Sequence, residues 1–376
     1  MNEAPLFVFG TLRCRPLRDI VLGDPEGVRA IPATLAGVRT HWVAGADYPV
    51  LIDDPDGSSN GLLLDGLDPT HRARLDFFEG GFDYDLVPAN VETAEGPRDA
   101  VRYRPSSPPE AGGPWSLAEW EARHAPRWLA AAEEAMDYFG RIDAETLASR
   151  MSQIWLRAAS RVRAAAPLPA TVRSAATSQE DVETLVHSRP YGNYFTVVEK
   201  DLSFRRFDGS WSDPATRAGF VSGDAVTVLP YDPVADTALV IEQFRVGPHL
   251  RGDPMPWVLE PIAGRVEPDE SVETTARREA QEETGLDLGT LHFISGHYPS
   301  PGMVAEYVYS YVAEAYLADQ DGTVAGAAEE NEDIRSHVVP LDSLIEMVRT
   351  GEVASGPLVI SVLWLALNRD RLRAGA

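Results

Sequence analysis

The chain has 376 residues, a length at which a single hydrophobic core stops growing, so we expect two domains. It carries 58 acidic and 33 basic side chains and a net charge of −25. This excess of acid argues against nucleic acid as a partner, because few cations are left to neutralise phosphates. An anionic substrate therefore needs a local arginine cluster or a bound metal.

Cysteine usage and apolar runs favour a cytoplasmic protein with no membrane partner. The chain has one cysteine, Cys14, which cannot form an internal disulfide. Its first residues lack a basic region and a long apolar region, so no signal peptide is predicted. The apolar run at residues 359–367 is about half of a membrane span and indicates a buried helix.

The first half predicts a small β-rich unit followed by helices. The apolar run at residues 6–9 stops at Gly10, which indicates a strand and a tight loop. Further strand-like runs continue to about residue 104. Ser116 begins an Ala-rich helical stretch, and the aperiodic residues 167–178 indicate a linker. The predicted parts are a first domain at 1–112, a helical connector and linker at 113–178, and a second domain at 179–376.

Strand-like and helical runs alternate in the second half, which predicts an α/β sandwich. The expected elements are a strand at 195–204, a hairpin at 225–244, a helix within 264–286, a strand at 306–315, an acidic loop at 320–333 and two C-terminal helices.

The run GRVEPDESVETTARREAQEETGL, residues 264–286, ends in three closely spaced glutamates. We expect its helix to begin near Pro268-Asp269 and to end at Gly285. On a helical wheel, Val272, Ala276 and Ala280 define the apolar stripe. Glu279 and Glu283 fall on that stripe with Glu282 beside them, whereas Glu273, Arg277, Gln281 and Thr284 face away.

Acids on the inward face need a cation, because buried like charges raise each other's pKa. Hard carboxylate oxygens at helical spacing suit Mg²⁺ or Mn²⁺, which also bridge phosphate oxygens. An acidic surface helix with Glu–Arg pairs is the alternative interpretation.

The same run resembles the Nudix box, G-x5-E-x7-R-E-U-x-E-E-x-G-U, at every charged and glycine position. The resemblance implies an α/β/α sandwich with a mixed sheet, and hydrolysis of a nucleoside diphosphate linked to another group. It assigns Glu282 and Glu283 to catalysis. It implies that divalent cations bind the backbone carbonyl of Ala263 and the carboxylates of Glu279, Glu282, Glu283 and Glu332. It also implies that Gly264, Glu270, Arg278 and Gly285 shape the loop and helix.

Residues 195–368 are similar to the ADP-ribose pyrophosphatase branch of that family. The matching pieces are IEQFR at 241–245, WVLEPIAG at 257–264, YPSPGMVAE at 298–306 and EENEDIRSHVV at 329–339. Pro301 lies sixteen residues beyond Gly285, a placement which that family associates with ADP-ribose. The resemblance implies substrate contacts from Arg245, Glu260, Pro301 and Gly302. A surface ion pair is the alternative for Arg245.

The acidic loop at residues 326–335 carries the general base in that branch, and the match selects Glu330, with Glu332 second. Water deprotonated there would attack one phosphorus, giving AMP and ribose 5-phosphate from ADP-ribose. GDP-mannose, FAD or another nucleotide sugar are alternative substrates, and a sensor that binds without cleaving is a further alternative. The related enzymes are homodimers, so a dimer through residues 180–260 is expected. The chain also resembles, more weakly, two-domain Nudix proteins linked to tellurite resistance, but this resemblance implies nothing about the reaction.

PLFVFGTLR at 5–13 and LDFFEGGFDYDLVPANVET at 75–93 resemble the γ-glutamylcyclotransferase or AIG2-like family. The resemblance implies a small β-barrel with helices. In it, the N–H groups of Gly10, Thr11 and Leu12 would hold a substrate carboxylate, and Glu79 would serve as general acid and base in closing a 5-oxoproline ring.

This first domain departs from the family at two points. Phe9-Gly10-Thr11 stands where Tyr-Gly-Ser is usual, and the arginine often found after the tyrosine equivalent to Tyr84 is missing. The alternative to a catalytic role for Glu79 is a structural one, in which its side chain caps or stabilises a turn. Three roles are therefore open for this domain. It could be an active γ-glutamyl cyclotransferase with the Nudix domain as its regulator, it could bind a small ligand without catalysis, or it could only pack against its neighbouring domain.

Overall fold

The computed structural model describes residues 3–80, 84–166, 171–172, 179–326 and 332–375. The chain divides into two compact units, Met1–Leu168 and Pro169–Ala376. No helix within the described ranges is long and apolar enough to cross a membrane.

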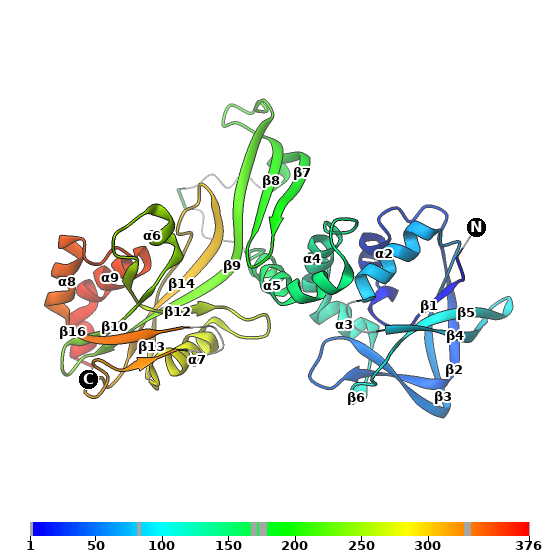
Figure 1. The fold of residues 1–376 in the computed structure, drawn as a ribbon, viewed down its shortest axis with the longest axis horizontal. Helices are drawn as coiled ribbons and strands as arrows, with labels where there is room; N and C mark the ends of the chain where they lie inside the picture. The colour runs from blue at the N-terminus through cyan, green and yellow to red at the C-terminus, as the bar shows by residue number, and fades with distance from the viewer. Residues whose placement is uncertain (1–2, 81–83, 167–170, 173–178, 327–331, 376) are drawn as a thin grey trace. The chain divides into compact units, whose positions relative to one another are not determined.

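The first unit is a small closed β-barrel with helices packed against it (Figure 1). Its strands follow the order β3-β1-β5-β4-β2, and a further β2–β3 pairing closes the sheet, while β6 extends β2. Of these pairings, β1 with β5 is parallel. The strands are β1 Leu6–Val8, β2 Arg29–Val43, β3 Pro49–Asp65, β4 Tyr84–Thr93, β5 Gly96–Pro105 and β6 Ala111–Pro114. The helices are η1 Thr11–Arg13, α1 Arg15–Leu22, α2 Pro69–Glu79, α3 Leu117–Arg123, α4 Ala125–Met136 and α5 Ala144–Arg163.

Two apolar clusters stabilise the first unit because successive strand residues point to opposite faces. Leu63 joins Phe7 in one cluster, and its neighbour Leu64 joins Trp120 and Ile154 in the larger one beneath the helices. The helices predicted as a connector therefore contribute to this core, and α4 and α5 are also joined by the buried pair Glu134–Arg157. The domain boundaries at residues 112 and 178 stay predictions.

The second unit is built on a mixed sheet in the order β13-β14-β9-β10-β16-β15 (Figure 1). β14 and β9 are parallel, and β11, β12 and the β7–β8 hairpin pair with its inner strands. The strands are β7 Val182–Gly192, β8 Thr196–Phe204, β9 Ala215–Asp232, β10 Thr237–Phe244, β11 Trp257–Glu260, β12 Ile262–Arg265, β13 Leu291–His297, β14 Val304–Glu314, β15 Val324–Ala325 and β16 Ile334–Pro340. The helices are η3 Gln179–Asp181, α6 Val246–Arg251, α7 Val272–Thr284, α8 Leu341–Thr350 and α9 Gly356–Arg373.

Helices cover both faces of this sheet. Val226 and Val228 of β9 share a cluster with Ala276 of α7, whereas Leu229 and Tyr231 share the opposite cluster with α8 and α9. The side chains of β9 point alternately to the two faces of the sheet, so neighbouring residues of this strand pack against different helical layers. The predicted α/β/α sandwich with a mixed sheet, and the barrel that precedes it, are confirmed.

Candidate functional site

Helix α7 presents the glutamates of the second unit. It begins at Val272 rather than at Pro268-Asp269, because the hydroxyl of Ser271 caps it by accepting from the N–H of Thr274 at 3.1 Å. It ends at Gly285, whose φ of 70° is the left-handed conformation that glycine adopts without strain. The predicted end is therefore confirmed, and the predicted start was wrong by about one turn.

Burial along α7 follows the wheel except at its last residue. Glu283 is buried, with 2% of the residue exposed, whereas the side chain of Glu279 is 15% exposed and that of Glu282 is 49% exposed. Thr284 was predicted to face away, but it is buried, and its hydroxyl donates to the carbonyl of Ala280 at 2.6 Å. Ala280, one turn earlier, belongs to the apolar cluster that also contains Leu286 and Leu288.

The strand β12 lies against this helix at a glycine. A Cβ placed on Gly264 would stand 1.8 Å from Oε1 of Glu279, so no larger residue fits without moving that carboxylate. The neighbouring Ala263 donates its N–H to Oε2 of Glu283 at 3.3 Å. Backbone and carboxylates are therefore in direct contact at this point.

Arg278 holds three of the box carboxylates together. Its Nε donates to both oxygens of Glu270 at 3.2 Å, and its Nη1 lies 2.8 Å from Glu282 and 2.9 Å from Glu279. Glu270 also accepts from the hydroxyl of Thr275 at 2.9 Å. The helix and the loop before it are thus cross-linked through one guanidinium group.

The electrostatics of this cluster favour a bound cation. Burial, together with the charges of Glu282 and Glu332, raises the pKa of Glu279 to about 7 against the opposing effect of Arg278. Burial and the charges of Glu279 and Glu332 raise the pKa of Glu283 well above its ordinary value, and Arg245 opposes this shift. Carboxylates in such surroundings are stabilised in their charged form by a divalent ion.

The donor set fits a hard divalent cation, because it consists of carboxylate oxygens beside a strand backbone. Among the described residues, no group of three or more His, Cys, Asp or Glu side chains is already arranged to hold a metal ion. Arg278 pairs with Glu279 and Glu282, so its guanidinium would compete with a cation for the same oxygens.

The other residues predicted for this site are spread over its surroundings. Arg245 donates through Nε to Oε2 of Glu260 at 2.6 Å, which joins the two predicted substrate contacts to each other. Pro301 and Gly302 lie exposed in the turn between β13 and β14, which is closed by hydrogen bonds to the carbonyl of Ser300. Glu330 lies outside the described residues.

Next to Gly264 lies a group of aromatic and charged side chains that was not predicted from the sequence. The guanidinium of Arg265 lies 4.3 Å from the ring centroid of Tyr194, and its charge acts on Glu306. Glu306 accepts from the hydroxyl of Ser222 at 3.1 Å, and burial raises its pKa. These residues are far apart in the sequence, and the position of Arg265 directly after the box glycine was the available signal.

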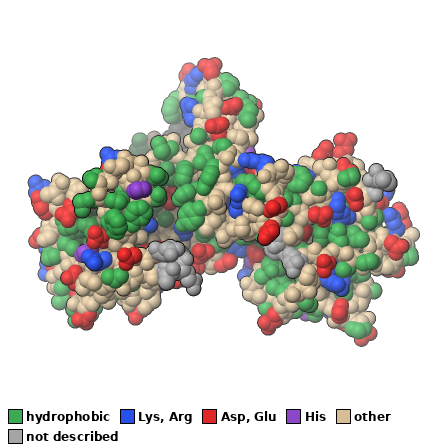
Figure 2. Space-filling view, viewed as in Figure 1, with side chains coloured by type: hydrophobic (Ala, Val, Ile, Leu, Met, Phe, Trp, Pro, Cys, Tyr) green, Lys and Arg blue, Asp and Glu red, His purple; other side chains and the backbone are tan. Residues whose placement is uncertain are grey.

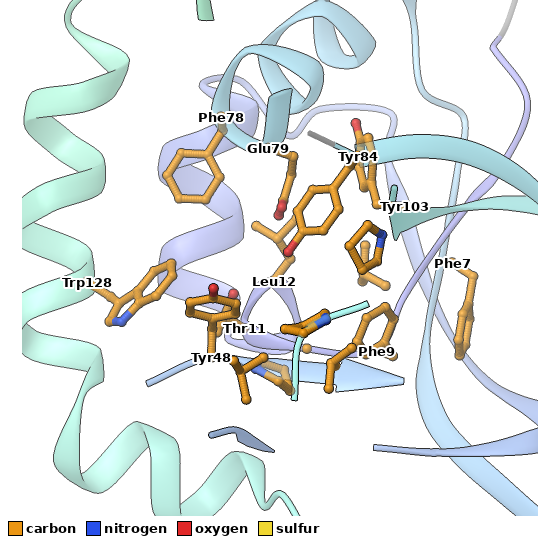
Figure 3. Close-up of a pocket in the computed structure, with 17 residues that line it drawn as sticks. Phe7, Phe9, Thr11, Leu12, Tyr48, Phe78, Glu79, Tyr84, Tyr103 and Trp128 are labelled. Atoms are coloured by element: carbon orange, nitrogen blue, oxygen red, sulfur yellow. The ribbon is translucent and has the colours of Figure 1, made fainter. Parts of the chain in front are cut away.

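A pocket of about 70 Å³ opens in the first unit (Figure 3). Its lining includes the loop Gly10–Leu12 and Glu79, which the family resemblance assigns to one site. Tyr84, named from the sequence, also lines the pocket, and so do Tyr48, Tyr103 and Trp128, which were not predicted. In Figure 3, Tyr84 lies beside Glu79 within the pocket.

Glu79 is the last residue of α2 and is half-buried. Loss of hydration raises its pKa to about 7, which suits a group that exchanges protons at neutral pH. Burial, and to a lesser extent the charge of Glu79, raises the pKa of Tyr84. The hydroxyl of Tyr103 donates to Asp76, one turn before Glu79 on the same helix, and this bond fixes the wall of the pocket.

The loop that begins at Gly10 is stabilised by hydrogen bonds from Arg18. Arg18 is buried and donates through Nη1 to the carbonyls of Leu12 at 3.1 Å and Arg13 at 3.2 Å. A Cβ on Gly10 would stand 2.7 Å from Cγ of Pro49, so this position needs glycine for a close approach. The geometry of the loop is therefore set by contacts on both sides.

Comparison with known proteins finds one family match in each unit. The NUDIX domain family matches residues 221–359, and the family described as Gamma-glutamyl cyclotransferase, AIG2-like, matches residues 6–122. The ADP-ribose pyrophosphatase of Haemophilus influenzae is 35% identical over 198 residues, which span 52% of this chain and 91% of that protein.

Three further similar proteins differ in their printed names. The ADP-ribose pyrophosphatase of Escherichia coli strain K12 is 35% identical over 195 residues, or 52% of this chain and 92% of that protein. A GDP-mannose pyrophosphatase of E. coli is 32% identical over 176 residues, or 47% of this chain and 90% of that protein. A solved structure titled as an ADP compounds hydrolase covers 49% of this chain and 91% of its own, with 23% identity and a TM-score of 0.36. The chain belongs to the Nudix hydrolase family, and residues 6–122 of its first unit match the family described as Gamma-glutamyl cyclotransferase, AIG2-like.

Proposed function

We propose that the second unit hydrolyses the diphosphate of ADP-ribose to AMP and ribose 5-phosphate. The observation that carries this proposal is the inward-facing pair Glu279 and Glu283, pressed against the backbone at Ala263 and Gly264. The names of the relatives at 35% identity support ADP-ribose as the substrate, and the GDP-mannose relative at 32% supports the alternative less well.

Each residue has a proposed role in this reaction. A divalent cation, Mg²⁺ or Mn²⁺, would bind the carbonyl of Ala263 and the carboxylates of Glu279, Glu282, Glu283 and Glu332. When bound, it would neutralise charge on the diphosphate. Arg245, whose guanidinium is oriented by Glu260, would hold a phosphate or the ribose, and Pro301 and Gly302 would border the sugar. Glu330 would take a proton from the attacking water as its oxygen bonds to phosphorus and the P–O–P bridge breaks.

Substitution of Glu283 by Gln tests the proposal, because it removes a charge from the cluster while keeping the side-chain shape. We expect kcat for AMP release from ADP-ribose to fall by several orders of magnitude with Mg²⁺ saturating. Glu273→Gln, on the exposed face of the same helix, is the matched control and should remain near wild type. Near-wild-type turnover by Glu283→Gln would refute the assignment, and faster GMP release from GDP-mannose would select the other substrate.

We further propose that the second unit forms a homodimer. Exposed apolar side chains gather over α6 and the start of β11, as Figure 2 shows. This α6 patch consists of Phe244, Val246, Leu250, Met255 and Trp257. The β7–β8 hairpin also exposes Leu185, Val186 and Tyr191. Contiguous apolar surface of this kind is typical of protein interfaces. A monomer mass from light scattering would contradict the dimer.

A second candidate function belongs to the first unit, and the raised pKa of Glu79 within its pocket favours it. We propose that this unit is a γ-glutamyl cyclotransferase. The α-amino nitrogen of the substrate would attack its γ-carbonyl carbon, and the bond from that carbon to the leaving amine would break. Glu79 would accept the proton of the attacking amine and pass it to the leaving nitrogen. The products would be 5-oxoproline and a free amine.

Release of 5-oxoproline from γ-glutamyl compounds measures this second activity. We expect Glu79→Gln to abolish it and to leave ADP-ribose hydrolysis unchanged, because the two sites lie in different units. Glu119→Gln, an exposed position on α3, serves as the control. Undiminished 5-oxoproline release by Glu79→Gln would contradict the role of that residue.

A further inference from the structure

A second, apolar cavity of about 90 Å³ adjoins the pocket that holds Glu79. Phe78 and Trp128 line both spaces, and in Figure 3 they lie together at one side of the pocket. The remaining walls come from α4 and α5, and they are Ala131, Ala132, Leu147, Ala148, Met151 and Trp155. Most of these residues follow residue 122, where the match to the cyclotransferase family ends.

Trp128 is fixed in place between the two spaces. Its indole Nε1 donates to Oδ2 of Asp47 at 2.9 Å, which prevents the ring from turning freely. Tyr48, which lines the pocket, lies 6.5 Å from Trp128, and Trp155, which lines the cavity, lies 5.0 Å from it, each measured between ring centroids. A wall held by a hydrogen bond and by aromatic contacts keeps the cavity from collapsing.

The lining defines the chemical class of the occupant. None of the described residues that line the cavity is charged, so an ionic group would lose its hydration there without compensation from them. The alanines at 131, 132 and 148 leave space that larger side chains would fill. An apolar protein cavity of about 150 Å³ holds benzene. A space of about 90 Å³ therefore suits a branched aliphatic group of three or four carbons rather than an aromatic ring.

We propose that this cavity is a specificity subsite for a branched aliphatic group on the substrate of the first unit. The glutamyl end of that substrate would lie against Glu79 and the loop Gly10–Leu12, and the apolar part of its amine would pass Phe78 and Trp128 into the cavity. The inference rests on the cyclotransferase function proposed above. It adds that α4 and α5 select the leaving amine.

The test compares γ-L-glutamyl-L-leucine with γ-L-glutamylglycine on the full chain. Calorimetric titration measures the affinity, and chromatography measures 5-oxoproline. We expect the leucine compound to bind at least about tenfold more tightly, because several carbons leave water. Ala148→Leu, which fills the cavity from its half-buried side, should remove this preference. Ser149→Leu adds the same bulk at the exposed neighbouring position and should retain the preference.

Two further outcomes separate the subsite from the reaction. A leucine preference that Ala148→Leu removes, with no 5-oxoproline from either compound, supports the subsite and rejects the cyclotransferase. Equal affinities in the wild type, a preference that survives Ala148→Leu, or no binding of either compound overturns the subsite. Met151→Ala enlarges the cavity without adding bulk, and it should shift the preference toward γ-L-glutamyl-L-phenylalanine. An unchanged order of affinities in that variant also counts against the subsite.

Discussion

Gly264 of β12 and Glu279 of α7 are packed so closely that a Cβ on the glycine would lie 1.8 Å from the carboxylate oxygen. The two residues are separated by a loop and two helical turns, yet the backbone of one sets the position of the other. The glycine of the box is therefore required by space rather than by its backbone angle. The first prediction follows from this contact.

Substitution of Gly264 by Ala should displace the carboxylate of Glu279 and lower kcat/KM for ADP-ribose by about 100-fold, the usual cost of a misplaced catalytic group. Steady-state AMP release measures the effect. Gly356→Ala is the control, because nothing lies within 4 Å of a Cβ at that position, and it should leave turnover unchanged. Equal activity of the two variants would show that Glu279 has no positional role.

Arg278 should be intolerant even of lysine. A lysine ammonium cannot span Glu270, Glu279 and Glu282 as the planar guanidinium does. We expect Arg278→Lys to lower activity about 10- to 100-fold, the range typical for partners of metal ligands. Arg277→Lys, on the same helix, is the control, because Arg277 donates to the carbonyls of Leu288 and Gly289 and to none of the box carboxylates in the described structure; its activity should stay within about twofold. The prediction is wrong if both variants lose activity alike.

The stability of the first unit should depend on the ionisation of Glu79. Its pKa is raised from 4.5 to about 7, so its protonated form is favoured in the folded state. The contribution to stability is complete below pH 4.5 and is lost as the pH rises through about 7. Glu79→Gln, which mimics the protonated acid, should therefore gain Tm relative to wild type between pH 5 and 8. Calorimetry that gives parallel Tm curves would exclude the shift.

Asp236 should matter for the stability of the second unit far more than Asp342. Asp236 accepts from Arg369, Arg373 and Tyr231, and its side chain is 14% exposed. We expect Asp236→Asn to lower the free energy of unfolding by about 2 kcal/mol, because hydrogen bonds to a charged group are lost. Asn is chosen because residue 236 has a φ of 60°, which Asn tolerates.

Asp342 provides the control for this network. It meets Arg369 at 2.6 Å, but its side chain is 77% exposed, so Asp342→Asn should cost less than about 1 kcal/mol. Urea titration followed by circular dichroism compares the two variants. The pKa of Asp236 is depressed by Arg369, so the difference between wild type and Asp236→Asn should vanish as the pH falls through that depressed value. A difference that persists in acid would point to lost shape rather than lost charge.

Much of the second unit could be predicted because its signals are local. Apolar residues that recur every two positions in the strands and every 3.6 positions in α7 predicted the α/β/α sandwich. The spacing of the box placed Glu279 and Glu283 on one inward-facing stripe of the helix. The errors occurred where packing overrides local pattern. Thr284 turns inward at the end of α7, and Ser271 caps the helix later than Pro268 suggested. The predicted site roles stay predictions.

The sequence alone determined the family resemblance, the alternation of layers and the identity of the box glycine and acids, because backbone periodicity and motif spacing are properties of neighbouring residues. The tertiary structure decided the pocket of the first unit, where Leu12, Tyr48, Glu79 and Trp128 meet from separate elements. It also decided the cavity beside that pocket and the raised pKa of Glu79. Space and hydration depend on contacts between distant segments, and no local pattern encodes them.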